Sequence, residues 1–163
     1  MKKIFFWTVL ILIIIYLFIW LGSKIAPVGS YPYRESYIFN TNEQSLISAI
    51  EDFKKANPQY VVPRNDLLDK RKEYWYHFYI YYAEENQIIH FWTRQFPRNE
   101  TEIGFDAVND GLELGNWKTI NSSDFSSAKN KEAKKKFEDR ILKKLNYKYT
   151  DEGNGMKIFG IQF

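Results

Sequence analysis

The side chains best suited to chemistry in this 163-residue chain are its two histidines, His77 and His90. Both lie between Tyr74 and Gln95, where two aromatic-rich segments flank a short acidic turn at Glu84–Gln87. An imidazole beside a carboxylate can act as a general acid or base, and two imidazoles on one surface can contribute to a metal site. The aromatic and basic side chains interleaved with them could stack on sugars, peptides or bases.

The two aromatic-rich segments are typical of a β-hairpin, because they are dense in β-branched and aromatic residues. Side chains alternate across a strand, so the number of loop residues decides which of them share a face. A loop of two or four residues collects apolar side chains on one face, whereas a loop of three mixes both faces. The sequence therefore favours the even loop. The core face would then hold Phe78, Ile80, Ile89 and Phe91, and the opposite face, a candidate binding surface, would hold Trp75, His77, Tyr79, Tyr81, His90, Trp92 and Arg94 together with Ile88.

Patterns that identify a catalytic centre are missing from the sequence. There is no GxSxG turn, Gly-rich phosphate loop or recognised metal-ligand spacing. The chain has no cysteine, which removes thiol catalysis, disulfides and thiolate metal sites. Glu84 and Glu85 fall in a solvated turn, where nothing is expected to raise the pKa of either carboxyl group. We therefore expect no metal and no cofactor, and a binding surface rather than an active site.

The N-terminal segment from Ile4 to Leu21 has 18 residues without a charge, which as a helix would span about 27 Å, enough to cross a bilayer. Lys2 and Lys3 precede it, so a cleaved signal peptide and secretion are the alternative. The length of the apolar run and the poor cleavage sites favour an uncleaved signal-anchor. The distribution of basic residues leans towards an N-terminus in the cytoplasm and a domain outside it. The expected organisation is a transmembrane helix at 1–22, a stalk at 23–36 and an extracytoplasmic domain at 37–163.

Two helices and an antiparallel sheet are expected in that domain, an α+β fold of the order αββββαββ with both helices packed on the sheet. Thr41–Gln44 fits a capping box for the first helix, and Asn57-Pro58 ends it. The second helix, at about 125–145, has apolar residues at four-residue steps. Further strands are expected at 101–108, with Ile103, Phe105 and Ala107 inward, and at 112–120. The chain would close with a hairpin of 147–150 and 156–163, pairing Tyr149 with Phe159 and Tyr147 with Ile161.

Charge argues against a nucleic-acid partner. The formal net charge is +3, of which Lys2 and Lys3 contribute two, so the rest of the chain carries only +1. The second helix is rich in lysine, but interrupting acidic residues favour a solvated face over a lipid-binding one. The sequence thus predicts a single-pass bacterial envelope protein that acts as a non-catalytic binding or accessory module for an unknown protein or small ligand. An immunity-type inhibitor of a toxin and a small hydrolase using His77 or His90 are the alternatives.

Overall fold

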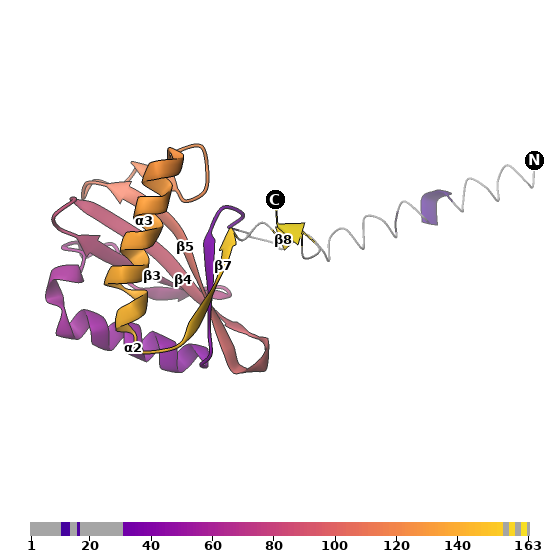
Figure 1. The fold of residues 1–163 in the computed structure, drawn as a ribbon, viewed down its shortest axis with the longest axis horizontal. Coiled ribbons are helices and arrows are strands. Elements are labelled where there is room, and N and C mark those ends of the chain that lie inside the picture. Colours follow the sequence, from indigo (N-terminus) through magenta and orange to yellow (C-terminus); the bar gives the residue numbers. More distant parts are fainter. Residues whose placement is uncertain (1–10, 14–15, 17–30, 155–156, 159–160, 163) are drawn as a thin grey trace, which may run out of the picture. The chain divides into compact units, whose positions relative to one another are not determined.

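The structure is a computed structural model that describes residues 11–13, 16, 31–154, 157–158 and 161–162. The chain divides into two compact units, Met1–Ser30 and Tyr31–Phe163 (Figure 1). Most of the predicted membrane segment, residues 4–21, lies outside the described residues, and residues 11–13 and 16 within it are helical. Among the residues that are described, no helix is both long enough and apolar enough to span a bilayer.

The second unit is built on an antiparallel sheet, which has seven strands within the described residues (Figure 1). Each strand pairs with its neighbours in antiparallel fashion. The strands lie in the order β2 (Lys70–Lys72), β3 (Trp75–Tyr82), β4 (Gln87–Phe96), β5 (Glu100–Asp110), β1 (Glu35–Phe39) and β7 (Tyr149–Asn154), and β6 (Trp117–Thr119) pairs with the end of β5 beyond β1. The predicted α+β class is confirmed. β1 begins at Glu35, two residues before the domain start expected from the sequence.

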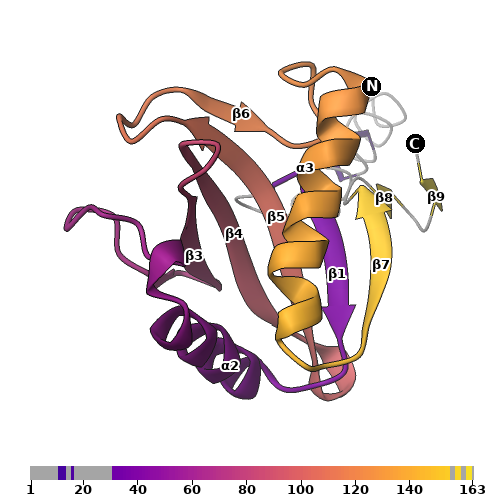
Figure 2. The ribbon, with the colours of Figure 1, turned by 60° about the vertical axis from the view of Figure 1, so that its left-hand side comes forward.

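Two helices, α2 (Glu43–Ala56) and α3 (Ser127–Arg140), cover one face of this sheet (Figure 2). The N-cap of α2 is Asn42, whose side chain accepts a hydrogen bond from the Ser45 N–H at 2.9 Å, so the predicted cap at Thr41 is wrong by one residue. Thr41 is still part of the turn out of β1, because its N–H donates to the Phe39 carbonyl. Short 3-10 turns occur at η1 (Pro58–Tyr60), η2 (Pro97–Asn99) and η3 (Leu142–Lys144).

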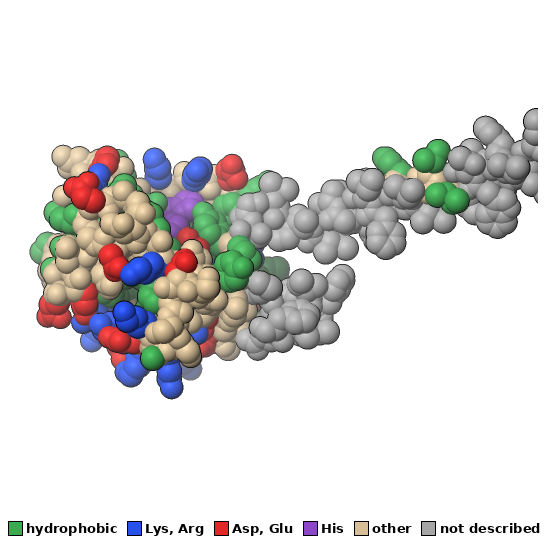
Figure 3. Space-filling model, turned by 90° about the horizontal axis from the view of Figure 1, so that it is seen from above, with side chains coloured by type: hydrophobic (Ala, Val, Ile, Leu, Met, Phe, Trp, Pro, Cys, Tyr) green, Lys and Arg blue, Asp and Glu red, His purple; other side chains and the backbone are tan. Residues whose placement is uncertain are grey.

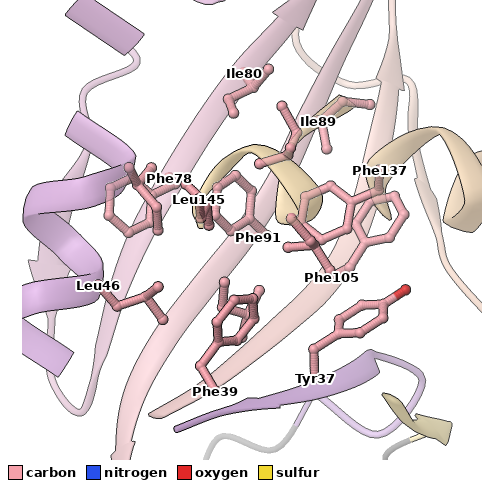
Figure 4. Close-up of a cluster of buried hydrophobic side chains, with 14 of the residues drawn as sticks. Tyr37, Phe39, Leu46, Phe78, Ile80, Ile89, Phe91, Phe105, Phe137 and Leu145 are labelled. Carbon is pink, nitrogen blue, oxygen red and sulfur yellow. The ribbon is translucent and has the colours of Figure 1, made fainter. Parts of the chain in front are cut away.

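The hydrophobic core lies between the helices and the sheet (Figure 4). Each large apolar side chain buried here contributes about 1.5–3 kcal/mol relative to an exposed one. The four residues predicted for the core face of the hairpin are all buried in it, and so are the predicted inner residues Phe137, Ile141 and Leu145 of the second helical region. The labelled members in Figure 4 are Tyr37, Phe39, Leu46, Phe78, Ile80, Ile89, Phe91, Phe105, Phe137 and Leu145.

The hairpin of β3 and β4 has the predicted even loop. Phe78 pairs with Phe91 and Ile80 with Ile89, and the last pair, Tyr82 and Gln87, leaves four residues in the turn. One of these, Asn86, adopts a φ of 51°, which asparagine tolerates better than most residues. The register therefore separates a core face from an opposite face, as the alternation of side chains predicts.

A β-bulge in β5 changes the register that the sequence predicted. Phe105 lies opposite Phe91 and Ala107 opposite His90, so Asp106 is an extra residue on the β5 side. As a result Ala107 shares a face with His90 instead of pointing into the core. The prediction that Ala107 points inward is wrong, because strict alternation does not hold across a bulge.

The C-terminal strands also pair differently from the prediction. β7 continues through Gly153 and pairs along β1, with Tyr149 opposite Phe39 and the two rings stacked at 5.1 Å. The remaining strands, β8 (Lys157–Ile158) and β9 (Ile161–Gln162), pair with each other in a separate sheet. The predicted terminal hairpin is therefore wrong. The predicted order αββββαββ also omits β1 and β2 and one strand at the C-terminus.

Candidate functional site

The face of the sheet opposite α2 and α3, here called the second face, carries all seven residues predicted for binding. The β3–β4 register aligns His77 with Trp92 and Tyr79 with His90 on this face. The structure brings Trp75, His77, Tyr79, His90 and Trp92 into one cluster. Tyr81 lies apart from the cluster, near the turn, where its hydroxyl donates to Asn86 Oδ1 at 2.9 Å, and Arg94 lies at a separate cavity. Figure 3 shows histidine atoms at the surface among hydrophobic and charged side chains.

The two histidines form a hydrogen-bonded chain with Asp106. His90 Nδ1 lies 3.0 Å from Asp106 Oδ2, and His90 Nε2 lies 2.9 Å from His77 Nδ1. The imidazole rings are nearly parallel, with an interplanar angle of 6°. The bulge positions the carboxylate, since it adds Asp106 to the strand next to the residue that faces His90.

The partners of each nitrogen indicate the tautomers of the two imidazoles. A carboxylate only accepts hydrogen bonds, so His90 Nδ1 donates to Asp106. In a neutral His90, Nε2 then accepts from His77 Nδ1, and this leaves His77 Nε2 as an acceptor without a partner among the described residues. Burial, followed by the neighbouring His90 and Lys72, lowers the pKa of His77 to about 4. His77 is therefore neutral at pH 7.

Aromatic side chains from two further parts of the fold pack on the histidines. Tyr31, which precedes β1, lies with its ring centre 6.2 Å from that of His77 and 5.4 Å from that of Trp75. Trp117 in β6 packs edge-on to His90 at 5.9 Å. Only 7% of His77 and 8% of His90 is exposed. The imidazoles are consequently held in an aromatic environment with little access to solvent.

The indole ring of Trp92 lies close to the backbone of β5 at Gly104. Gly104 is opposite Trp92 in the register, and an alanine Cβ at Gly104 would overlap the indole ring. Only 1% of Trp92 is exposed. The indole N–H groups of Trp75 and Trp92 are buried and have no hydrogen-bond acceptor among the described residues. A buried donor without an acceptor costs roughly 1–3 kcal/mol.

Glu102 forms a second polar network on the same face, beyond Trp92. Its carboxylate accepts hydrogen bonds from Arg34 Nε at 2.9 Å, from Arg94 Nε at 2.6 Å and from Ser36 Oγ at 2.6 Å. Burial alone would raise the pKa of Glu102, but the two guanidinium groups lower it. Glu102 is thus an ionised carboxylate with a side-chain exposure of only 2%, held between two arginines.

A cavity of about 430 Å³ opens beside this network. Its volume is in the range of small-molecule binding sites. Arg94 lies in its wall with the Trp92 and Phe96 rings 5.8 and 5.9 Å from the guanidinium carbon. The cavity is lined by Arg34, Ser36, Ile38, Arg94, Phe96, Glu100, Glu102, Thr150, Glu152 and Asn154.

In the part of the chain that the structure describes, the imidazoles hydrogen-bond to each other and to Asp106, and no serine or threonine hydroxyl bonds to them. No group of three or more histidine, aspartate or glutamate side chains among the described residues is placed to hold a metal ion.

The basic residues of the second helical region are largely engaged within the protein. Lys134 pairs with Glu35 on β1, and Arg140 pairs with Glu84 and Glu85 at the β3–β4 turn. Lys136 also contacts Glu85, at 3.1 Å. These contacts attach α3 to the sheet, which reduces the basic charge left to attract a lipid surface.

Sequence reasoning missed five residues of the second face. Their positions depend on the β5 bulge, on β6 and on the segment that precedes β1. No local pattern in the sequence indicates any of these three features. An isolated acidic residue within an apolar strand, as in the segment 101–108, is the one signal that could have drawn attention to the carboxylates. The missed residues are Tyr31, Arg34, Glu102, Asp106 and Trp117.

Comparisons with family models, with curated proteins and with solved structures gave no match.

Proposed function

We propose that the protein is a non-catalytic binding or accessory module that engages its partner through the second face of the sheet. A single membrane-spanning helix at residues 4–21 would hold it at the bacterial cell envelope, with the domain outside the cytoplasm. The 18-residue apolar run supports the anchor.

One observation carries the proposal: the cavity of about 430 Å³ opens on the same face as the aromatic and histidine cluster, and a buried ion-pair network lies in its wall. Taking Glu102 and two arginines out of water is costly, and such networks do not on balance add stability over apolar packing. Binding a ligand or partner is a function that this arrangement supports, because it presents oriented cationic donors next to aromatic rings.

The Asp106–His90–His77 chain is the observation that favours the alternative, a small hydrolase. An acid does lie beside the histidines, as such an enzyme requires. However, both imidazoles are more than nine-tenths buried, and the low pKa of His77 makes it a weak base at neutral pH. The cavity is lined by other residues. We therefore assign the chain of three side chains to positioning the aromatic cluster. The third possibility, an immunity-type inhibitor, would be a special case of the binding module.

Site-specific photo-crosslinking in intact cells tests this proposal. A photoreactive phenylalanine analogue would replace Phe96 at the cavity or Tyr81 on the second face, one at a time in the full chain. Lys131, exposed on α3, is the matched control position. Intact-mass analysis of the purified chain detects adducts of small ligands as well as of proteins.

The proposal predicts adducts at Phe96 or Tyr81 that are absent at Lys131. Adducts at Lys131 alone, or no adduct at either second-face position, would contradict it.

A further inference from the structure

Arg94 in the cavity wall has N–H donors that the described part of the protein does not use. Arg94 contacts Glu102 through Nε, and in the described part of the chain its two terminal nitrogens have no hydrogen-bond partner. The guanidinium carbon lies 5.8 Å from the Trp92 ring centre and 5.9 Å from the Phe96 ring centre, so cation–π contacts favour this position. A planar pair of N–H donors held in place is suited to a carboxylate or another oxyanion, which it can bind with two parallel hydrogen bonds.

The other charges of the cavity select among oxyanions. Two of the three glutamates that line it are engaged within the protein, because Glu102 is held by two arginines and Glu152 also has an interaction partner. A ligand with one carboxylate and one ammonium group could contact Arg94 and the remaining glutamate at its two ends, whereas phosphate has no cationic group for the second contact. Glu100 is the suitable partner for the ammonium group, because its carboxylate forms no ion pair within the described residues.

The β4–β5 register indicates the length of such a ligand. Arg94 is opposite Glu102 and Phe96 is opposite Glu100, so Arg94 and Glu100 belong to pairs two residues apart along the same face. Two residues of strand span about 7 Å. An extended dipeptide has about the same length between its ends, whereas the two charges of a single amino acid are closer together.

We propose that this cavity binds a zwitterionic ligand of the short-peptide class, with its carboxylate on the outer edge of Arg94 and its ammonium group on Glu100. Phe96 and Ile38 in the wall provide apolar surface for the side chains of the ligand. The proposal rests on the proposed function, because it names the ligand of the same second face.

Isothermal titration calorimetry of the full chain in detergent micelles tests the ligand class. Alanyl-alanine is the probe, and its N-acetyl and C-terminal amide derivatives each lack one charge. Inorganic phosphate is the competing oxyanion. We expect saturable binding of alanyl-alanine, affinity at least about tenfold lower for each derivative, and weaker binding of phosphate.

Variants assign the two ends of the ligand. Arg94→Gln should weaken alanyl-alanine at least about tenfold, whereas Arg98→Gln, in the exposed η2 turn outside the cavity, should leave it unchanged. Glu100→Gln should weaken alanyl-alanine but not its N-acetyl derivative. This second variant keeps the test valid if Arg94→Gln fails to fold, which circular dichroism would show.

The absence of saturable alanyl-alanine binding, or equal binding of all three peptides, would overturn the ligand class. In that case photo-crosslinking at Phe96 and Tyr81 distinguishes the two proposals. Adducts at those positions would leave the binding module standing with a different ligand, and their absence would remove both.

Discussion

Replacing Gly104 with alanine should destabilise the protein by displacing Trp92 from the second face. The new Cβ would meet the indole ring with Cη2 at 2.6 Å and with Cζ2 and Cε2 closer still. Optimal carbon contacts are about 3.5–4.0 Å, so the ring would have to move by roughly 1 Å. Trp92 is 1% exposed and packs against the Tyr31 ring, so there is little room for this movement. We expect a loss of about 1–3 kcal/mol in the free energy of unfolding.

A double-mutant cycle separates this clash from a general intolerance of alanine in β5. Trp92→Leu removes the ring that the new methyl group would meet, so Gly104→Ala should cost less than about 0.5 kcal/mol in that background. Urea denaturation of the four proteins, followed by far-UV circular dichroism, gives the coupling free energy. A single Gly104→Ala variant as stable as the wild type would refute the close packing of Trp92 on β5. If Gly104→Ala lowers the unfolding free energy as much in the Trp92→Leu background as in the wild type, the clash with the indole ring is refuted as the cause.

Three further predictions concern the buried polar groups. The pKa of His77 is about 4 in the folded protein and 6.5 in the unfolded chain, so its contribution to stability is complete above about pH 6.5 and is lost as the pH falls towards 4. His77→Gln should therefore flatten the dependence of the unfolding free energy on pH in this window. An unchanged slope would contradict the lowered pKa of His77. Asp106→Ala should lower the free energy of unfolding by about 1–3 kcal/mol, because the His90 N–H loses its buried acceptor. NMR should also show a shifted His77 Cε1–H resonance. An unchanged resonance would contradict the hydrogen-bonded chain. Glu102→Gln should lower the free energy of unfolding by about 3–5 kcal/mol, since two arginines lose their shared carboxylate. The control Glu132→Gln on α3 should change it by less than about 0.5 kcal/mol in the same denaturant titrations. Equal effects of the two substitutions would argue against the ion-pair network of Glu102.

The local elements and the two faces of the hairpin could be predicted from the sequence because they follow from short periodicities. The alternation of Phe78 with polar neighbours decides the parity of the β3–β4 loop within a few residues. The apolar positions of α2 and α3 repeat at helical spacing, so their inner faces were predictable as well. Each of these features is specified by residues close together in the chain.

The features that the sequence did not reveal depend on residues far apart in the chain. The ion pair between Arg34 and Glu102 joins positions separated by 68 residues. The pairing of β1 with β7 joins positions still farther apart, such as Phe39 and Tyr149, which are 110 residues apart in the sequence. The bulge at Asp106 depends on how β5 fits against two neighbouring strands at once. Hence the seven predicted surface residues were assigned to one face, while the acidic partners of the histidines and of Arg94 were not found.

Hydroxyl-radical footprinting of the full chain tests most directly whether the second face engages a partner in the cell. The labelling of Phe96 and Tyr81 on this face would be compared between intact cells and the purified protein in micelles. Tyr147, 36% exposed at the C-terminal side of η3, is the reference residue. The binding module predicts that Phe96 and Tyr81 are protected in cells while Tyr147 is labelled equally in both. Equal labelling of all three, or protection of Tyr147 alone, would contradict it.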